Sequence, residues 1–155
     1  MPVGLELFRL GTANYPVWDG AGAAAYGGRW NPPGAPVIYA AGALSLAMLE
    51  RLMQRRHLGQ TLCVAVEVPD DVMIEDLMTR PPSNWRALGS PEAVAAGGEW
   101  IAARRTPLLR VPSALVPREP NYLVNPAHPD TRRIRIGVAE KLEWDARLFG
   151  VPSPT

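Results

Sequence analysis

Prolines and glycines are distributed along nearly the whole chain, and they limit the length of any regular element that it can form. The 155 residues include 17 prolines and 14 glycines. Because both residue types interrupt helices and strands, we expect short strands and a few helices joined by ordered turns. A doubly wound parallel sheet would need regular alternation of strands and helices and a G-x-G-x-x-G turn, and the sequence has neither. The pattern predicts a compact α+β fold, with a mixed or antiparallel β-sheet core and peripheral helices.

Length and composition are typical of a single domain. Residues 1–150 are long enough to bury a core of their own, and residues 151–155 are expected to fray as a flexible tail. No segment has the basic start and apolar stretch of a signal peptide, and no window of about 18 apolar residues would span a membrane. The single cysteine, Cys63, has no partner for an internal disulfide. These features predict a cytoplasmic protein that does not enter a membrane.

The charge balance gives no reason to expect a nucleic acid as a direct partner, because the formal net charge is only +1. Basic clusters such as Arg104 with Arg105 are expected to be solvated or paired locally. The acidic residues between Asp70 and Asp76 have no histidine or cysteine at metal-ligand spacing. They therefore predict turns and a helix start, and no metal site.

Hydrophobic patterning and helix-start signals locate the main elements. Apolar runs or alternation predict strands at residues 5–10, 36–41 and 61–68. Capping signals predict two helices, one from about Ser45, as N-cap or first-turn residue, to about His57, and one from Ser90 to Arg104 or Arg105. Less regular stretches predict a loop at residues 12–25, a strand interrupted at Pro112 within residues 106–116, and a short strand at residues 135–138.

The densest group of potential functional residues lies between Gly20 and Glu50. Within it, the segment YGGRWNPPG joins two glycines, which allow close backbone approach, to two prolines, which prevent a helix. We expect a rigid, exposed turn that carries Arg29. A planar guanidinium suits a two-pronged contact with a phosphate or carboxylate, although an arginine that binds carbonyls within a turn would fit the same residues.

Glu50 is expected on or beside the apolar face of the helix that begins near Ser45, because it shares that face with Leu46 and Met53. A carboxylate in that position destabilises the fold unless a partner holds it. Arg29 or a cationic ligand would serve as that partner. An ordinary contact with polar neighbours or solvent at the edge of the face is the alternative.

Arg9 and Ser113 each have a structural and a functional interpretation. Arg9 lies on an otherwise apolar strand, so it must reach solvent at a sheet edge or pair with an anion. Ser113 follows Pro112 at an edge or bulge, where it would satisfy local backbone groups or donate to a ligand. A hydrolase triad of Ser113, His128 and Asp130 is not expected, because no G-x-S-x-G elbow surrounds the serine.

Three segments together resemble a known family: GAGAAAYGGRWNPPGAPVIYAAGALSLAMLE, RVPSALVPREPNYLVNPAHPD and LEWDARLF. They are similar to the RES domain, the toxin component of bacterial RES–Xre toxin–antitoxin modules, over nearly the whole chain. The arginine, glutamate and serine that give the family its name fall on Arg29, Glu50 and Ser113. The resemblance implies a fold like that of the diphtheria-toxin type of ADP-ribosyltransferases, a cleft between β-sheets, and NAD as the substrate.

The resemblance also implies roles for individual residues when the nicotinamide–ribose bond of NAD breaks. Glu50 would stabilise an oxocarbenium-like state near the ribose, and Arg29 would hold the pyrophosphate or ribose. Tyr39 would stack on or border the nicotinamide ring, and Ser113 would donate to the nicotinamide or its ribose. The remaining implied contacts are Asn125 in the pocket wall and Arg9 as a second phosphate ligand.

The acceptor of the ADP-ribose unit stays open. Water would make the protein an NAD glycohydrolase, phosphate a phosphorylase, and a protein side chain an ADP-ribosyltransferase. None of these reactions requires a metal, because the nicotinamide of NAD is already a cationic leaving group. The alternative is a non-catalytic module whose cleft only docks an antitoxin. The implied partners are an Xre-type helix-turn-helix antitoxin and, for transfer, a target protein, and self-association also stays open.

Overall fold

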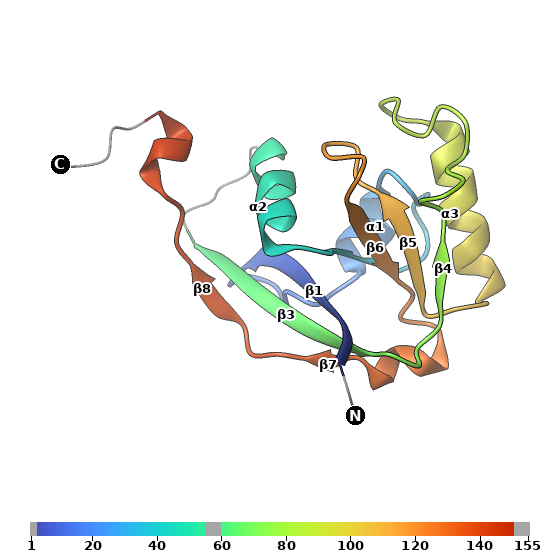
Figure 1. Ribbon diagram of the computed structural model, residues 1–155, viewed down its shortest axis with the longest axis horizontal. Coiled ribbons are helices and arrows are strands. Elements are labelled where there is room, and N and C mark those ends of the chain that lie inside the picture. The colour runs from blue at the N-terminus through green and yellow to red at the C-terminus, as the bar shows by residue number, and fades with distance from the viewer. Residues whose placement is uncertain (1–2, 55–59, 151–155) are drawn as a thin grey trace.

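The computed structural model describes residues 3–54 and 60–150, and it contains a curled sheet with helices around it (Figure 1). The strands are β1 (Val3–Thr12), β2 (Ile38–Ala41), β3 (Thr61–Pro69), β4 (Ile74–Asp76), β5 (Leu108–Pro112), β6 (Pro120–Val124), β7 (Arg135–Ile136) and β8 (Glu140–Leu142). The helices are α1 (Ala21–Tyr26), α2 (Leu44–Met53) and α3 (Pro91–Ala103), with short 3-10 helices η1 (Pro129–Arg133) and η2 (Ala146–Phe149). The strand order is β4-β5-β6-β2-β1-β3-β7, and β8 also pairs with β3.

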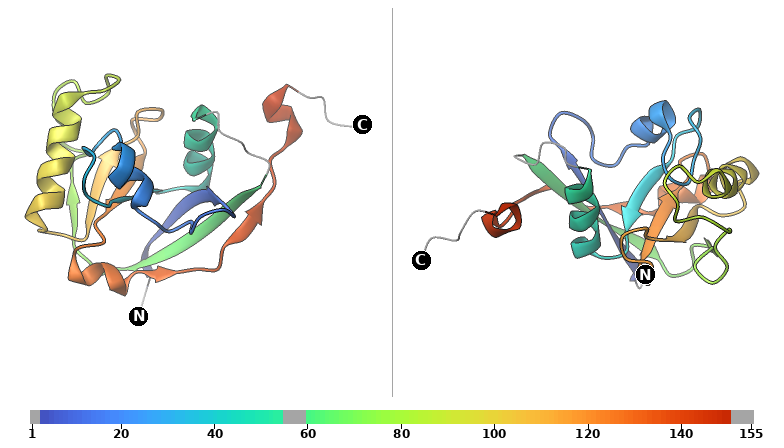
Figure 2. Two further views of the ribbon diagram at one scale, coloured as in Figure 1. Left: turned by 180° about the vertical axis from the view of Figure 1, so that it is seen from behind. Right: turned by 90° about the horizontal axis from the view of Figure 1, so that it is seen from above.

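The sheet is antiparallel apart from the parallel pair β4 and β5. Figures 1 and 2 show that it curls, so that β1 and β3 cross one side of the molecule while β4, β5 and β6 rise at the other. A shared apolar cluster joins the two parts, with Leu7 and Val66 from one and Leu108 and Val124 from the other. The α+β fold class predicted from the sequence is therefore confirmed.

The predicted strands at residues 5–10, 36–41 and 61–68 are present as β1, β2 and β3. The helix predicted after Ser90 is present as α3. Ser90 is its N-cap, as expected, since its Oγ accepts the N–H of Ala93 at 3.1 Å. The second predicted helix, α2, has Ser45 in its first turn. It ends at Met53, short of the predicted end near His57, a residue outside the described part of the chain.

Three local predictions are wrong for identifiable reasons. The loop expected at residues 12–25 contains the start of α1, where Asp19 Oδ1 accepts the N–H of Ala21 at 2.7 Å. The acidic residues from Asp70 to Asp76 form a turn at residues 70–71, as predicted, but the expected helix start is strand β4, because pairing with β5 decides the local backbone there. Pro112 is the last residue of β5 and not a break within a longer strand, so its missing N–H costs no central hydrogen bond.

A close contact between α3 and the segment after α1 fixes the position of the turn that carries Arg29. A Cβ atom added at Gly97 would lie 1.6 Å from the Trp30 carbonyl oxygen, so only glycine permits the observed approach. Trp30 also stacks on Trp85, with ring centroids 6.0 Å apart. Trp100 lies in the same apolar cluster and is fully buried. The mid-helix glycine therefore serves packing, and the residues around Trp30 are held from two sides.

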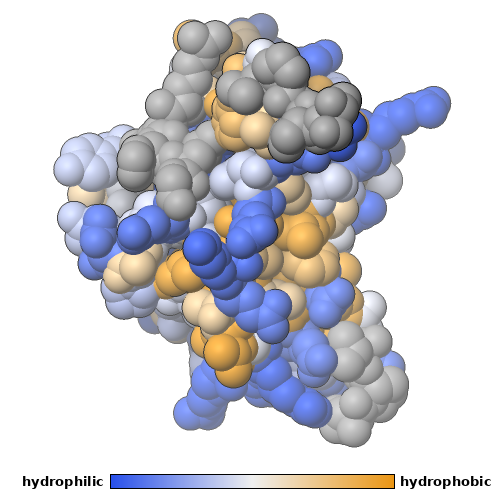
Figure 3. Space-filling view, turned by 90° about the vertical axis from the view of Figure 1, so that its left-hand side faces the viewer, coloured by the Kyte–Doolittle hydropathy of each residue, from blue (hydrophilic) through white to orange (hydrophobic). Residues whose placement is uncertain are grey.

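The C-terminal segment runs along the edge of β3. Trp144 is attached to it by a 2.9 Å hydrogen bond from its Nε1 to Thr61 Oγ1, and its ring meets Phe149 edge to face. Val138 and Leu148 are exposed. Figure 3 shows this side of the molecule, where hydrophobic patches lie between hydrophilic residues. The predicted tail at residues 151–155 lies outside the described residues, and no helix within the described ranges is long and apolar enough to cross a membrane.

Candidate active site

The turn that carries Arg29 is built on the side chain of Tyr39. Gly28 and Asn31 pair through their backbones and close the turn. The Tyr39 hydroxyl donates to Asn31 Oδ1 and accepts the N–H of Trp30 at 3.2 Å. A Cβ at Gly28 would lie 2.7 Å from the Tyr39 hydroxyl oxygen, so this position favours glycine. Strand β2 thus supports the predicted rigid turn directly, through the hydroxyl of Tyr39.

Burial raises the pKa of Tyr39 to about 12, although the hydrogen bond from Trp30 and the positive charge of Arg29 both act to lower it. The Tyr39 hydroxyl is therefore protonated at neutral pH and available as the donor to Asn31. Arg29 directly precedes Trp30, whose N–H binds the Tyr39 hydroxyl, so its positive charge acts on this pKa.

Arg29 is half-buried and binds a neighbouring loop through one of its nitrogens. Its Nη1 lies 3.3 Å from the Trp85 carbonyl oxygen and 3.2 Å from those of Arg86 and Ala87. The predicted alternative of an arginine bound to carbonyls is therefore present. Among the described residues, no hydrogen bond uses Nε or Nη2 of Arg29, so these two nitrogens can still meet an anion.

Glu50 is held by two neutral donors, one in the turn between β5 and β6 and one on β6, and Arg29 is not among its hydrogen-bond partners in residues 3–54 and 60–150. Ser113 Oγ donates to Glu50 Oε1 at 2.8 Å, and Asn121 Nδ2 donates to the same oxygen at 2.9 Å. The structure thus brings together two predicted site residues, Glu50 and Ser113, which are separated by 63 positions. Within the described residues, no hydrogen bond occupies the second oxygen, Oε2.

Ser113 begins the turn between β5 and β6, and it is fully buried. Its Oγ accepts the N–H groups of Leu115 and Val116, each at 3.1 Å. Because these two bonds fill its acceptor sites, the hydroxyl proton is directed to Glu50. Both interpretations offered for Ser113 therefore hold in part, since the side chain organises the local turn and also donates to a functional candidate.

The Glu50 cluster, defined as Glu50, Ser113 and Asn121, lies on the same sheet face as Tyr39. Tyr39 is paired with Leu123 and Ala41 with Asn121 across β2 and β6, and alternate residues of a strand share a face. Tyr39 is two residues from Ala41, the residue opposite Asn121, so the two side chains are offset by about 7 Å along the strand direction. Arg86 Nε further connects the two regions by donating to the Ala114 carbonyl at 2.9 Å.

Arg9 does not occupy either of the environments expected from the sequence. It donates to the carbonyl oxygens of Val17, Tyr39 and Asp19 at 2.6, 2.7 and 3.3 Å. Burial lowers its pKa, and the nearby charge of Arg51 acts in the same direction, while Asp19 acts to raise it. These contacts tie β1 to β2 and to the segment before α1. A role as a phosphate ligand stays a prediction.

Asn125 lies beyond the opposite end of β6 from the Glu50 cluster. It is four positions from Asn121, or about 13 Å along an extended chain. Its Nδ2 donates to the Ile101 carbonyl at 3.1 Å, and its Oδ1 accepts the N–H of Ala127 at 3.0 Å. The structure thus joins Asn125 to the end of α3, apart from Glu50, and its predicted contact with substrate stays untested.

No group of three or more histidine, cysteine, aspartate or glutamate side chains in the described ranges could hold a metal ion. His128 accepts the N–H of Asp130 through Nδ1 at 3.0 Å and so caps η1. This contact gives His128 a structural role. The Ser113 hydroxyl donates its hydrogen bond to Glu50 and not to His128.

Comparison with known proteins decides the family. A model of the RES domain matches residues 6–145 of this chain. The chain belongs to the RES domain family. A protein of Sphingobium sp. (strain YBL2) named Prs ADP-ribosylating toxin is 39% identical over 138 residues, covering 84% of this chain and 86% of that protein. Toxin Res of Yersinia enterocolitica is 38% identical over 133 residues, covering 80% and 86% of the two chains.

The fold of this RES domain chain is similar to that of a chain in the solved M. tuberculosis MbcT–MbcA toxin–antitoxin complex. The match has a TM-score of 0.71 and 20% identity, and it covers 89% of this chain and 84% of the other. At this identity the likeness shows a shared fold. It agrees with the fold that the resemblance to the RES domain implied.

Sequence reasoning missed Asn121 and Asn31, the side chains that bind Glu50 and Tyr39. Asn121 opens the segment NYLV, where it looks like a turn residue next to Pro120. The pairing of β6 with β2 turns it toward Glu50, and only knowledge of that register would have identified it. Asn31 lies in the predicted turn, but its partner Tyr39 follows on another element.

Proposed function

We propose that this RES domain protein is the toxin of a bacterial toxin–antitoxin pair, and that it consumes NAD by cleaving the bond between nicotinamide and ribose. The observation that carries this proposal is the environment of Glu50, a carboxylate oriented by Ser113 and Asn121 through one oxygen only. The names of the relatives from Sphingobium and Yersinia, an ADP-ribosylating toxin and Toxin Res, support the same class of activity.

The chemistry needs a carboxylate near the ribose. When the bond from ribose C1′ to the nicotinamide nitrogen breaks, its electron pair leaves with nicotinamide, which becomes neutral, and positive charge develops on the ribose. A preorganised carboxylate stabilises that charge, as in glycoside hydrolysis. The acceptor oxygen or nitrogen then bonds to C1′ and releases its proton. Glu50 Oε2 is the oxygen that we assign to this contact.

Arg29 is proposed to bind the pyrophosphate or ribose of NAD through Nε and Nη2, while Nη1 stays on the 85–87 carbonyls. Tyr39 is proposed to border the nicotinamide with its ring while its hydroxyl holds the Gly28–Asn31 turn. Ser113 is fully buried, so we propose that it acts by supporting Glu50. The contacts of Arg9 and Asn125 favour support of the surrounding structure.

The acceptor is tested by incubating the purified protein with NAD, with and without inorganic phosphate and with candidate acceptor proteins. Free ADP-ribose with nicotinamide identifies water, ADP-ribose 1-phosphate identifies phosphate, and label retained on protein identifies transfer to a side chain. Nicotinamide release in any arm supports the proposal. If no arm releases nicotinamide, and the Glu50→Gln variant is as toxic in cells as the parent, the proposal is wrong.

We also propose that a cognate antitoxin of the Xre helix-turn-helix type binds the protein in the bacterial cytoplasm. The solved toxin–antitoxin complex with the same fold supports a protein partner of this kind. Co-expression with the product of a neighbouring helix-turn-helix gene should give a complex that purifies together and consumes NAD more slowly. Independent elution and unchanged NAD consumption would contradict the proposal.

A further inference from the structure

Asn121 supplies the second hydrogen bond to Glu50, and the chemistry of the pair fixes how its amide is oriented. An ionised carboxylate only accepts hydrogen bonds, so Asn121 must present Nδ2 to Glu50 Oε1, as observed at 2.9 Å. Its Oδ1 therefore points away from that oxygen. Asn121 is half-buried, and its Oδ1 is not among the fully buried side-chain atoms of the described residues that lack a hydrogen-bond partner.

The two donors to Glu50 come from positions that the sheet fixes firmly. Asn121 lies on β6, where it is paired with Ala41 of β2 on one side and Val111 of β5 on the other. Ser113 lies immediately after β5, held by its bonds to two backbone N–H groups. Glu50 comes from α2, a separate element. The Glu50 carboxylate is therefore bound by two donors, one on the central strand β6 and one in the turn after β5.

Both donors bind Oε1, and this asymmetry distinguishes the two carboxylate oxygens. A carboxylate oxygen has two lone-pair sites, and the hydroxyl of Ser113 with the amide of Asn121 fills those of Oε1. The plane of the carboxylate is then restricted, and Oε2 is left for a ligand. Side chains held by surrounding hydrogen bonds in this way give the accurate placement that catalysis needs.

We propose that Asn121 is a positioning residue for Glu50, which acts with Ser113 to fix the carboxylate so that Oε2 faces the ribose of the substrate. This inference rests on the proposed NAD-cleaving function. It assigns Asn121 no direct contact with the reacting atoms. Its effect is exerted through Glu50, so losing Asn121 lowers the rate of the chemical step more than the affinity for NAD.

The isosteric change Asn121→Asp gives the sharpest test, because it keeps the shape of the side chain and replaces the donor with an acceptor. We expect kcat for nicotinamide release to fall at least about tenfold, with KM for NAD within about twofold of the parent. The matched control is Asn14→Asp, which makes the same chemical change at an exposed turn and should leave both constants unchanged. The thermal midpoint of each variant shows whether it folds.

A double-mutant cycle separates positioning from a merely structural role. If Asn121 acts only through Glu50, Asn121→Ala lowers kcat in the parent but has no further effect in the Glu50→Gln background. A structural contribution would lower the residual rate by the same factor in both backgrounds. Additive losses in the cycle would therefore overturn the inference, as would an Asn121→Asp effect confined to KM or an Asn121→Asp variant that turns over like the parent.

The failure of this inference is distinguishable from failure of the proposed function. If the parent releases nicotinamide and Glu50→Gln releases it much more slowly, the function stands, and the Asn121 variants then decide the positioning role alone. Should Asn121→Asp fail to fold, Asn121→Ala in the same cycle gives the answer. If the parent protein releases no nicotinamide with any acceptor, and Glu50→Gln is as toxic in cells as the parent, the proposed function is wrong and the positioning role falls with it.

Discussion

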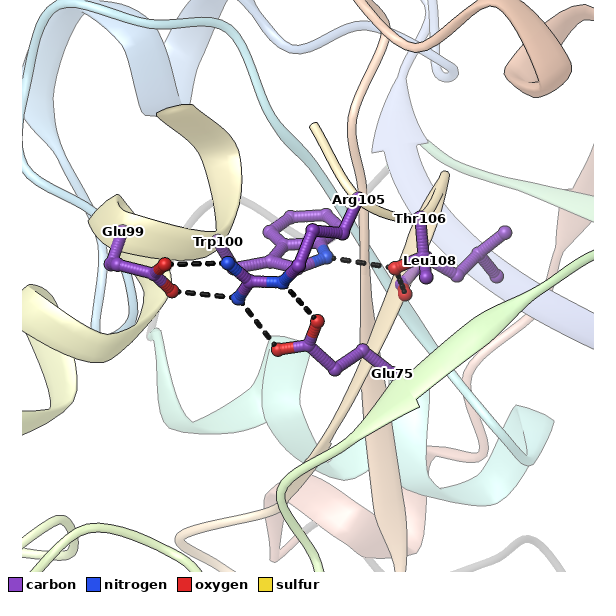
Figure 4. A network of polar contacts seen from close by, with 6 residues as sticks. All are labelled: Glu75, Glu99, Trp100, Arg105, Thr106 and Leu108. Atoms are coloured by element: carbon purple, nitrogen blue, oxygen red, sulfur yellow. Dashed lines mark hydrogen bonds and ion pairs between the residues drawn. The ribbon is translucent and has the colours of Figure 1, made fainter. Parts of the chain in front are cut away.

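Two polar clusters in this molecule use charged side chains in opposite ways. In the Arg105 cluster, defined as Arg105, Glu75 and Glu99, one guanidinium binds all four carboxylate oxygens at 2.5–3.0 Å (Figure 4). In the Glu50 cluster, two neutral donors bind one carboxylate oxygen. The first cluster satisfies its hydrogen-bonding groups within itself, whereas the second leaves a charged oxygen available.

Location strengthens the contrast. Side chains of the Arg105 cluster are solvent-accessible, with relative exposures of 45%, 28% and 61% for Arg105, Glu75 and Glu99. Hydrogen bonding to Arg105 lowers the pKa of Glu99, and the two carboxylates raise the pKa of Arg105. Solvent screens such pairs, so they contribute little to stability. The Arg105 cluster is thus a set of local ion pairs at the surface, as predicted for Arg105. In the Glu50 cluster, by contrast, the partly buried carboxylate keeps one oxygen that can bind a ligand.

The largest effect on stability is expected beneath the Arg105 cluster, at Trp100. This side chain is fully buried, and its Nε1 donates to Thr106 Oγ1 at 3.0 Å. Trp100→Ala should lower the free energy of unfolding by about 3–5 kcal/mol through lost apolar burial and a cavity. Urea denaturation measures it, with the exposed Leu88→Ala as a control that should change little. A loss no larger than the control would show that the apolar cluster around α3 is not close-packed.

Ser113→Ala tests the Glu50 cluster and should reduce both activity and stability. The change leaves the N–H groups of Leu115 and Val116 without their acceptor and removes one donor from Glu50. We expect the unfolding free energy to fall by about 1–3 kcal/mol. We also expect kcat for NAD cleavage to fall roughly 10- to 100-fold. A loss of stability without a change in kcat would show that Ser113 stabilises its turn but does not contribute to catalysis through Glu50.

Tyr39 is an intermediate case, a half-buried side chain whose hydroxyl binds Asn31 and Trp30 of the turn that it supports. Tyr39→Phe should lower the free energy of unfolding by about 1–2 kcal/mol, because these two residues lose their partner. Its folded pKa of about 12 lies above the ordinary value near 10. The associated stability is therefore present below pH 10 and is lost between about pH 10 and 12. Unfolding free energies of Tyr39→Phe should fall less over this range than those of the parent. Parallel pH curves would contradict the assignment.

The smallest effect is expected at Arg105 itself. Arg105→Ala should lower the thermal midpoint by no more than about 2 °C, and 1 M salt should reduce even that difference, because exposed ion pairs are screened. NAD cleavage should be unchanged. A midpoint shift as large as that of Trp100→Ala would remove the distinction between the two clusters.

Local features of the fold were predictable, whereas contacts between distant segments were not. Strand β3 and the capped start of α3 follow from apolar patterning and from the Ser90 cap. The strand β4 was missed, since pairing with β5 and not local preference decides it. Topology is set by the sum of such long-range pairings, which a single sequence does not display.

The candidate site shows the same limit. Glu50 was identified because a carboxylate beside an apolar helix face needs a partner, and Ser113 because of its place after Pro112 and the family resemblance. The partners expected for Glu50 were Arg29, a cationic ligand, or polar neighbours and solvent at the edge of the helix face, but the structure provides Ser113 and Asn121. Asn121 is brought to Glu50 by the register of β6 against β2. Arg29 turns toward the 85–87 carbonyls, to which no sequence pattern pointed.

The most direct test of the central claim compares nicotinamide release from NAD by the parent protein and by Glu50→Gln. Glutamine keeps an oxygen for Ser113 and Asn121 but lacks the negative charge, so the fold and its thermal midpoint should be preserved. We predict that the parent releases nicotinamide and that kcat of Glu50→Gln is lower by roughly a factor of 100 to 1,000. Equal rates in the two proteins would contradict the assignment of Glu50 as the catalytic carboxylate.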